Sequence, residues 1–394
     1  MLWAILGALI LLANLVPVLD LARHFRDVPL LSRLTRTNAG EDERLPRLSV
    51  IVPARNEEHG VRAAVQSMLR ADYPNLEVIA VDDRSIDRTG EILAALEREH
   101  TSEHPGRLRV MTIHELPNGW LGKNHALWVG ARSATGDWLL FTDADVVFEA
   151  TCFRRAVAYS ERERLDHLTL SPRLLARGYW LNAFIDFFNY AFTVFQRPDL
   201  ANNPKSNVAI GVGAFNLIRR VAYEAIGTHA AISLRPDDDM RLAKRVKRRG
   251  LRQRVLNGAD LLSVDWYPSL GAAIRGLEKN AFAGGANYSV AGTLASIIAV
   301  IATLVLPYGA VLVTRPPARW LFAGTIGIQA TSFIYTNSLL RRPATRYFPV
   351  FPLAALLFCF AVLRSMWLTL RHGGIRWRET FYPLAELRRQ TGLE

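Results

Sequence analysis

Uncharged, apolar stretches occupy both ends of the chain and frame a polar middle. Residues 1–19 carry no charged side chain, and three further uncharged runs cover residues 280–314, 320–340 and 347–363. Each run is at or near the roughly 20 residues that a helix needs to cross a bilayer. The pattern predicts an N-terminal transmembrane anchor and two to three transmembrane segments near the C-terminus.

Basic residues next to these runs set the expected orientation. Arg23 and Arg26 follow the first run, which places the N-terminus outside and the middle of the chain in the cytosol. A cleaved signal peptide would need a basic start and a small-residue cleavage site, and neither occurs. Three full C-terminal crossings would leave the basic tail outside, against the same rule. The third run is the shortest and Arg364 follows it, so we expect this run to be re-entrant or interfacial.

Between the apolar ends, short apolar runs of strand length alternate with segments of helical pattern. Strands that alternate with helices indicate a parallel sheet with helices on both faces, which is an α/β fold. The predicted strands cover residues 48–52, 76–81, 108–113 and 138–142, and the predicted helices cover residues 57–70, 87–99 and 123–134. We expect an anchor over residues 1–20, a linker over 21–45, a catalytic domain over 46–275 and a C-terminal membrane region over 276–394.

Charged side chains cluster where three of the predicted strands end. Arg55 and Glu57 follow the first strand, Asp82 and Asp83 end the second, and an Asp-Ala-Asp triplet at 143–145 follows the fourth. In open α/β sheets, ligands bind at the carboxyl ends of the strands. Two carboxylates that flank one small residue can face one hard cation, and Mg²⁺ or Mn²⁺ bound in this way also contacts substrate phosphates. The pattern predicts a site for a metal ion and a diphosphate.

The excess of basic over acidic residues indicates which classes of binding partner the protein could have. Lys and Arg number 48 against 36 acidic residues, an excess that suits anionic lipid surfaces, nucleic acid or phosphorylated substrates. Eight basic residues fall between positions 241 and 254. A basic helix there suits anionic lipid head groups, and a solvated helix face fits equally well. No recognition motif accompanies the charge, so we expect no nucleic-acid partner.

Three motifs in the middle of the chain match a known family. They read VPARNEE over residues 52–58, VDDRSIDRT over 81–89 and FTDAD over 141–145. Together they resemble family 2 glycosyltransferases of the GT-A fold. GWLGK at 119–123 and GIRWR at 374–378 are similar to the membrane-bound branch, which includes hopanoid-associated and carotenoid glycosyltransferases and, more distantly, ceramide glucosyltransferase. The resemblance implies an α/β nucleotide-diphospho-sugar transferase domain with a Rossmann-like mixed sheet, flanked by transmembrane helices.

The resemblance also assigns a donor site, residue by residue. Asp83 would accept a hydrogen bond from uracil or its ribose, with Asp82 as the near alternative. Lys123 would contact a phosphate or the base. Asp143 and Asp145 would hold Mg²⁺ or Mn²⁺, and Asp143 would also face the donor. The first-strand residues that would line the base and ribose are Pro53, Ala54, Arg55 and Glu57.

A carboxylate farther along the chain is the implied general base. In this family the base lies in an acidic pair ahead of a helix, a short distance before a leucine, and PDDDMRL over residues 236–242 matches that arrangement. Counting back from Leu242 makes Asp239 the base and Asp238 its partner. The third adjacent aspartate leaves this choice open by one residue.

Two further features of the family are carried over with differences. The ceramide branch has an Arg-Trp motif beyond the base, which this chain lacks, and Arg275 or Lys279 could bind the diphosphate instead. Gly211 and Gly213 resemble the acceptor-side loop, where small residues let a substrate approach the backbone.

The resemblance implies an inverting glycosyltransferase that uses a nucleotide-diphosphate sugar, with a UDP-sugar as the expected donor. Its expected acceptor is a membrane lipid such as a hopanoid, a carotenoid or another glycolipid precursor. The expected location is the cell (inner) membrane, multi-pass, with a cytoplasmic catalytic domain. One alternative is a processive polysaccharide synthase, which would need a Gln-x-x-Arg-Trp motif and more spanning helices. Another is a catalytically inactive membrane scaffold, which would not need Asp143, Asp145 and Asp239.

Overall fold

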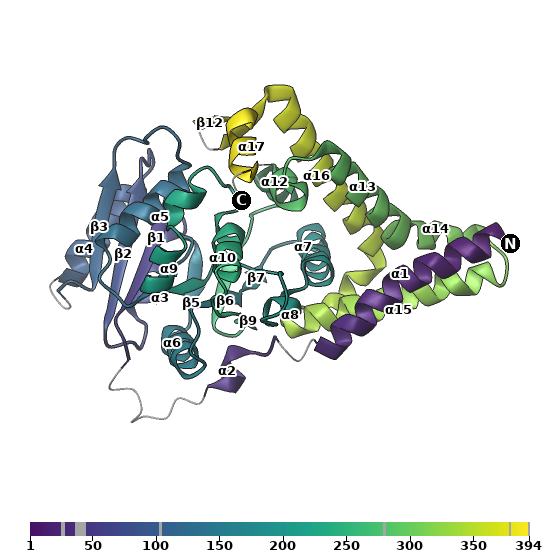
Figure 1. The fold of residues 1–394 in the computed structure, drawn as a ribbon, viewed down its shortest axis with the longest axis horizontal. Coiled ribbons are helices and arrows are strands. Elements are labelled where there is room, and N and C mark those ends of the chain that lie inside the picture. The colour runs from purple at the N-terminus through teal and green to yellow at the C-terminus, as the bar shows by residue number, and fades with distance from the viewer. Residues whose placement is uncertain (25–27, 36–44, 102–104, 279–280, 378–379, 393–394) are drawn as a thin grey trace. The chain divides into compact units, whose positions relative to one another are not determined.

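The computed structural model describes residues 1–24, 28–35, 45–101, 105–278, 281–377 and 380–392 (Figure 1). The chain divides into two compact units. The sheet unit joins Asp27–Leu175 with Pro198–Asp265. The helical unit joins Met1–Arg26, Ala176–Arg197 and Trp266–Glu394.

A mixed sheet of seven strands forms the centre of the sheet unit, in the order β3-β2-β1-β4-β8-β6-β9. The four strands that the apolar runs predict, β1 to β4, are parallel neighbours. β8 then pairs antiparallel with both β4 and β6, which makes the sheet mixed. The strands are β1 (Leu48–Ala54), β2 (Leu76–Asp83), β3 (Leu108–Ile113), β4 (Trp138–Phe141), β6 (His167–Ser171), β8 (Asn216–Arg219) and β9 (Gln253–Asn257).

Both faces of this sheet are covered, which explains why its strands are continuous apolar runs. Successive side chains of a strand point to opposite faces. Val50 and Val52 of β1 therefore pack into one hydrophobic cluster, while Ile51 packs into another. The first cluster is closed by α3 (Val61–Leu69), α4 (Thr89–Thr101) and α6 (Cys152–Arg162), and the second by α5 (Gly122–Ser133), α9 (Arg220–Ala225) and α10 (Asp238–Arg248).

A smaller three-stranded sheet and short helices complete the sheet unit. The strand order in this sheet is β5-β10-β7. β5 begins two residues beyond Ala144, so the chain turns from the main sheet into the small one at the acidic triplet. The elements are β5 (Val146–Phe148), β7 (Arg173–Leu175), β10 (Leu262–Asp265), α2 (Leu31–Leu34), α8 (Pro198–Ala201) and η4 (His229–Ile232).

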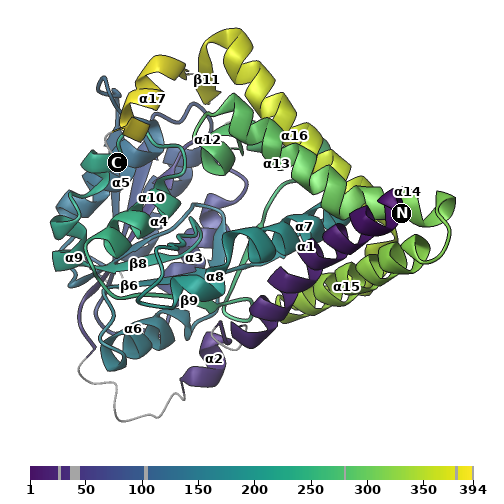
Figure 2. The same ribbon diagram turned by 45° about the vertical axis from the view of Figure 1, so that its right-hand side comes forward.

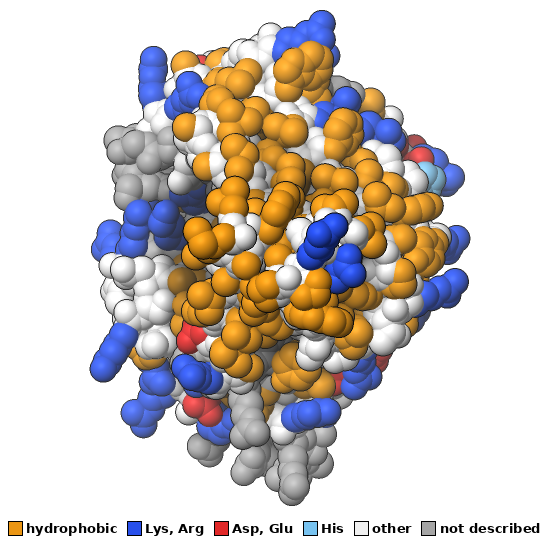
Figure 3. Space-filling model, turned by 90° about the vertical axis from the view of Figure 1, so that its right-hand side faces the viewer, with side chains coloured by type: hydrophobic (Ala, Val, Ile, Leu, Met, Phe, Trp, Pro, Cys, Tyr) orange, Lys and Arg blue, Asp and Glu red, His pale blue; other side chains and the backbone are white. Residues whose placement is uncertain are grey.

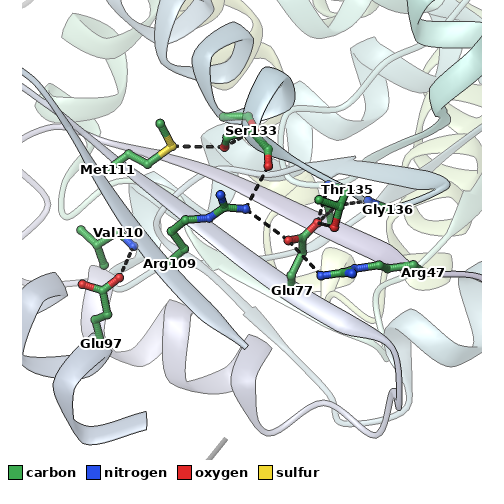
Figure 4. A network of polar contacts seen from close by, with 11 residues as sticks. Arg47, Glu77, Glu97, Arg109, Val110, Met111, Ser133, Thr135 and Gly136 are labelled. Atoms are coloured by element: carbon green, nitrogen blue, oxygen red, sulfur yellow. Dashed lines mark hydrogen bonds and ion pairs between the residues drawn. The ribbon is translucent and has the colours of Figure 1, made fainter. Parts of the chain in front are cut away.

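Glu77 near the start of β2 organises the edge of the sheet opposite to the strand ends that carry the acidic clusters (Figure 4). Its carboxylate accepts hydrogen bonds from Ser49 Oγ at 2.5 Å and from the Thr135 N–H and Oγ1 at 2.6 and 2.7 Å. Arg47 and Arg109 each lie 3.4 Å from it. Burial alone would raise the pKa of Glu77, but these hydrogen bonds outweigh burial and lower it. The network ties β2 to β1 and to the segment that enters β4.

Long helices dominate the helical unit. In both views α1 lies alongside α15, and α13 alongside α16 (Figures 1 and 2). The elements are α1 (Leu2–His24), α7 (Tyr179–Ala191), η3 (Phe192–Gln196), α11 (Leu270–Leu277), α12 (Ala281–Ala286), α13 (Val290–Val300), η5 (Ile301–Val305), α14 (Leu306–Val313), α15 (Ala318–Leu339), η6 (Ala344–Arg346), η7 (Phe348–Val350), α16 (Phe351–His372), β11 (Gly374–Trp377), β12 (Thr380–Pro383) and α17 (Leu384–Gly392).

Three helical stretches in the described part of the chain are long and apolar enough to cross a membrane: Leu2–Arg23, Val290–Val313 and Phe348–His372. The face turned toward the viewer in Figure 3 carries a broad hydrophobic surface, with Lys and Arg side chains mostly at its margins and some near its middle. The helix over the third apolar run continues past Arg364 to His372, so it is longer than the uncharged run itself. That this run is re-entrant or interfacial stays a prediction. The helix over the second run, α15, is long enough but is not among the stretches that are apolar enough to cross a membrane.

The composition of α15 explains this difference. Its inward side carries polar residues that are at most 4% exposed: Thr325, Gln329, Ser332, Thr336 and Asn337. Polar residues on long helices of membrane proteins face the protein interior. They lower the mean hydropathy of α15 although the helix is 22 residues long.

A proline creates one of the polar contacts in this interior. Pro307 has no N–H to donate to the carbonyl of Thr303, four residues earlier. Side chains from two other helices take its place: Asn14 Nδ2 of α1 lies 3.2 Å from that oxygen, and Gln329 Nε2 of α15 lies 2.9 Å from it. Gln329 also donates to Asn14 Oδ1 at 3.2 Å. Three helices are thus joined at one backbone carbonyl.

Candidate active site

The loops after β1 and β2 are fastened to each other by hydrogen bonds. The Asn56 N–H donates to Ser85 Oγ at 3.1 Å, and the Ile86 N–H donates back to Asn56 Oδ1 at 2.9 Å. The Glu57 N–H donates to Thr89 Oγ1 at 2.7 Å. Ser85 and Thr89, which the sequence analysis did not single out, therefore hold the predicted donor loop in place.

The residues at the end of β1 that are predicted to bind the nucleotide differ in their exposure to solvent. Pro53 and Ala54 are the last residues of the strand. Ala54 is 1% exposed and its side chain packs into the core. A ligand could therefore contact only the backbone of Ala54. Arg55 is nearly buried, and its Nη1 lies 3.9 Å from Asp83 Oδ2. Glu57 is half-buried at the start of the loop.

Asp82 and Asp83 have different surroundings. Asp82 Oδ1 accepts a hydrogen bond from the Ser85 N–H at 3.2 Å, which closes the turn after β2. Asp83 is bound by both arms of Arg84, with Nε at 2.7 Å and Nη2 at 2.9 Å. Arg84 has a positive φ of 56°, which is uncommon for a residue other than glycine. The carboxylate predicted to meet the base is therefore fixed by a neighbouring arginine that sequence reasoning had not placed in the site.

The acidic triplet forms the bend between β4 and β5. Ala144 is 4% exposed and packs into the core, so the two flanking carboxylates point away from it. Asp143 has a side chain that is 41% exposed. Burial, together with the carboxylates of Asp143 and Glu57, raises the pKa of Asp145 to about 7. The structure brings together Asp143, Asp145 and Glu57, which the sequence places after two different strands.

Lys123, in the first turn of α5, lies against the triplet. Its Nζ is 2.8 Å from Asp143 Oδ1 and 3.6 Å from Asp238 Oδ1. Burial alone would lower the pKa of Lys123, but Asp143, Asp238 and Asp239 outweigh burial and raise it. Lys123 therefore remains an ammonium ion between the strand-end carboxylates and those of α10.

The three adjacent aspartates at the start of α10 lie in distinct environments. Asp237 is fully engaged, since Arg235 Nε lies 3.0 Å and Arg241 Nε 2.7 Å from its carboxylate. Asp238 is buried beside Lys123. Asp239 accepts a hydrogen bond from the Met240 N–H at 2.7 Å, and burial and the adjacent Asp238 raise its pKa to about 7. A raised pKa suits a general base at neutral pH.

Gly211 and Gly213 form the wall opposite these carboxylates. A Cβ on Gly213 would lie 2.8 Å from Asp143 Oδ2, 3.4 Å from Lys123 Nζ and 3.6 Å from Asp239 Oδ2. A Cβ on Gly211 would lie 1.9 Å from the carbonyl oxygen of Asp239. The missing side chain at Gly213 therefore leaves space at which the predicted metal ligand, the lysine and the predicted base converge.

Two further phosphate-binding residues are predicted from the sequence. Arg275 is on α11 of the helical unit, and its role stays a prediction. Lys279 falls outside the described residues.

The basic segment on α10 has mainly structural contacts in its first part. Arg241 pairs with Asp237, Arg245 Nε donates to the Ile226 carbonyl at 2.7 Å, and Lys247 Nζ donates to the Asn203 carbonyl at 2.8 Å. The side chains that remain exposed near its end are Arg248, Arg249 and Arg252. The basic run thus contributes fewer free charges than its sequence indicates.

A match to a known family covers the strand-end part of this site but not the aspartates at residues 237–239. Residues 49–227 match the family described as Glycosyl transferase family 2. The chain is therefore similar to family 2 glycosyltransferases over this range, which is less than half of its length. Relatives of the chain include 4,4'-diaponeurosporenoate glycosyltransferase of Staphylococcus aureus (strain USA300), which is 22% identical over 352 residues, or 86% of this chain and 89% of that protein. The predicted resemblance to family 2 and to carotenoid glycosyltransferases is confirmed.

A shorter alignment is closer in identity. The probable glycosyltransferase YdaM of Bacillus subtilis (strain 168) is 37% identical over 103 residues, which are 26% of this chain and only 23% of that protein. Among solved structures, the mannosyltransferase PcManGT from Pyrobaculum calidifontis, in complex with GDP-Man and Mn²⁺, superimposes with a TM-score of 0.53 at 18% identity. That superposition covers 93% of this chain and 99% of PcManGT. The chain has the GT-A fold with a mixed sheet, as predicted.

The residues of the acidic triplet fit a divalent metal ion that is shared with a substrate. No group of three His, Cys, Asp or Glu side chains in the described ranges could hold a metal ion by itself. Asp143 and Asp145 offer hard oxygen donors, and they lie close enough for Asp143 to raise the pKa of Asp145. Mg²⁺ and Mn²⁺ often use one or two carboxylates and complete their shell with water and phosphate oxygens.

Proposed function

We propose that the protein is an inverting, metal-dependent glycosyltransferase that moves a sugar from a UDP-sugar to a membrane lipid. The observation that carries this proposal is the space beside Gly213, where Asp143, Lys123 and Asp239 converge. A transferase needs a donor-side cation site and a general base within reach of the same reacting atoms. In the sheet unit these come from β4, α5 and α10, which are distant in sequence.

In this proposal each carboxylate pair has one task. Asp143 and Asp145 would hold Mg²⁺ or Mn²⁺, which neutralises negative charge on the departing nucleoside diphosphate when bound. Asp83, Arg55 and the loop around Glu57 hold the nucleotide. Asp239 takes the proton of the acceptor hydroxyl while the oxygen of that hydroxyl forms a bond to the anomeric carbon of the sugar. The bond from that carbon to the diphosphate breaks on the opposite face, which inverts the configuration.

The acceptor side of the proposal rests on the membrane helices and on one relative. Three stretches of the helical unit are long and apolar enough to cross a membrane. The relative from S. aureus that aligns over most of its length is named as a glycosyltransferase of 4,4'-diaponeurosporenoate. A carotenoid, a hopanoid or another glycolipid precursor in the cell (inner) membrane fits both observations. The catalytic unit then faces the cytoplasm, where Arg248, Arg249 and Arg252 meet anionic lipid.

The experiment that tests this function is a donor screen with native acceptors. Purified full-length protein in detergent would be incubated with lipid extract of host membranes, Mg²⁺ or Mn²⁺, and a panel of UDP- and GDP-sugars. Mass spectrometry would then read out new glycolipids. We expect one UDP-sugar to give a product whose formation stops when EDTA removes the metal. Absence of both transfer and donor hydrolysis with every sugar would refute the function.

The assignment of Asp239 has its own test. Asp239→Asn keeps the shape of the side chain but cannot take a proton, so we expect turnover to fall by about 10²–10⁴-fold. UDP affinity, measured by calorimetry, should stay close to that of the unchanged protein. Glu224→Gln makes a matched change at an exposed position on α9 and should leave turnover unaltered. If Asp238→Asn abolishes turnover while Asp239→Asn does not, the base is Asp238.

A further inference from the structure

Lys123 is shared by the two carboxylate groups to which the proposed function gives separate tasks. Its Nζ lies 2.8 Å from Asp143, in the predicted metal pair, and 3.6 Å from Asp238, in the predicted base pair. The Lys123 side chain is only 21% exposed, so water screens these contacts weakly. One ammonium ion therefore links the donor side of the site to the acceptor side.

This position conflicts with a metal ion on the same carboxylate. A metal bound to Asp143 would bring two positive charges next to the Lys123 ammonium, and like charges repel more strongly in a partly buried site than in water. The conflict is removed when an anion enters together with the metal. A nucleoside diphosphate carries the required negative charge and offers oxygen atoms to both cations.

Gly213 lies next to the ammonium and has no side chain to separate it from Asp239. A Cβ on Gly213 would lie 3.4 Å from Lys123 Nζ, so the glycine leaves open the side of the ammonium that faces Asp239. Lysine also has a long, flexible side chain whose charge can be transferred between neighbouring acceptors without a change of the backbone.

We propose that Lys123 is an internal counter-cation for Asp143 in the donor-free protein, so that the metal ion and the nucleoside diphosphate bind tightly only together. The nature of the ligand rests on the proposed function. When both ligands enter, the ammonium leaves Asp143 for a diphosphate oxygen, and Asp143 becomes available to the metal. The coupling is reciprocal: the diphosphate tightens metal binding by the same factor as the metal tightens diphosphate binding.

The test measures metal affinity without turnover. Mn²⁺ binding to the full-length protein in detergent would be followed by the electron paramagnetic resonance signal of free Mn²⁺, with and without UDP or GDP. For the unchanged protein we expect one of the nucleotides to tighten Mn²⁺ binding by about 10-fold or more, within the usual range of coupling between sites. Lys123→Gln should bind Mn²⁺ more tightly without nucleotide and should lose most of the coupling. Lys123→Arg keeps the charge and should keep weak nucleotide-free binding.

An unchanged or weaker nucleotide-free Mn²⁺ affinity in Lys123→Gln would overturn the proposal. If that variant does not fold, the double variant Lys123→Gln/Asp238→Asn removes one charge of each sign and keeps the local net charge. It should show the same gain in Mn²⁺ affinity, and its failure to do so would equally overturn the proposal. Because no sugar transfer is measured, failure of the donor screen leaves this result standing, and failure here leaves the proposed reaction standing.

Discussion

Replacing Gly211 by alanine should displace the backbone of the predicted base. The added Cβ would lie 1.9 Å from the carbonyl oxygen of Asp239, whereas ordinary contact begins near 3.4 Å. The backbone at Asp239 must therefore retreat by about 1.5 Å. A misplacement of about 1 Å in a catalytic group costs on the order of 100-fold in rate. That factor corresponds to about 2.7 kcal/mol of transition-state stabilisation. Gly211 does not have a positive φ, so the alanine backbone is itself unstrained and the effect comes from the clash.

The assay separates turnover from donor binding. Initial rates of sugar transfer or donor hydrolysis give kcat, and calorimetry gives the affinity for UDP. We expect kcat to fall by about 100-fold and UDP affinity to change little, because the loops that we propose to hold the nucleotide follow β1 and β2. Gly309→Ala is the matched control, since a Cβ at this position on α14 meets nothing within 4 Å.

Two results would refute this reasoning. A kcat in Gly211→Ala close to that of Gly309→Ala would mean that the position of Asp239 does not limit the reaction. A parallel loss of UDP affinity would mean that the clash spreads through the sheet unit instead of acting on the base. Circular dichroism and elution volume confirm in either case that the variant is folded.

Three further predictions concern stability. Glu77→Ala should lower the free energy of unfolding of the sheet unit by about 3–5 kcal/mol, because buried donors lose a charged acceptor. Unfolding in urea measures this free energy, and an unchanged value would contradict the prediction. Burial lowers the pKa of His229 from 6.5 to about 3, so the unfolded state binds the extra proton and stability is lost as the pH falls below 6.5. The loss should be about 2 kcal/mol between pH 7.5 and 5, and His229→Gln should flatten the dependence of Tm on pH. Asn14→Leu should lower Tm in detergent by removing one donor to the Thr303 carbonyl. Pro307→Ala in the same chain should restore Tm, because it supplies a backbone N–H, and no recovery would argue against the contact.

The four parallel strands could be predicted because they are buried on both faces and therefore read as apolar runs. The strands at the other side of the sheet could not be predicted in this way, since they are short and contain buried polar residues. His167 of β6 and Gln253 of β9 illustrate the reason: Gln253 Nε2 lies 2.8 Å from His167 Nδ1 in the next strand. Such pairs satisfy their hydrogen bonds only after the strands meet. Their polarity along the chain therefore indicates loops.

The residues of the candidate site that follow strand ends could be predicted from the sequence. The residues whose role depends on tertiary contacts could not be assigned in this way. The position of Asp143 and Asp83 follows from the parallel sheet alone. Which of the adjacent aspartates at the start of α10 is free depends instead on Arg235 and Arg241, whose guanidinium groups engage Asp237. The role of Arg84 depends on a backbone angle, and no pattern of residue types reports that angle.

The carbonyl of Thr303 has a consequence for the order in which the helices assemble. Asn14 is 289 residues away from it in the sequence. At a synthesis rate of roughly 5–20 residues per second, α1 leaves the ribosome about 15–60 s before the segment that carries this carbonyl. During that interval the Asn14 amide has none of its partners from the later helices. Until then the Asn14 amide can donate only within its own helix, to the Ile10 carbonyl at 2.9 Å, and the three-helix contact closes only after the segment that carries Thr303 and Gln329 has been synthesised.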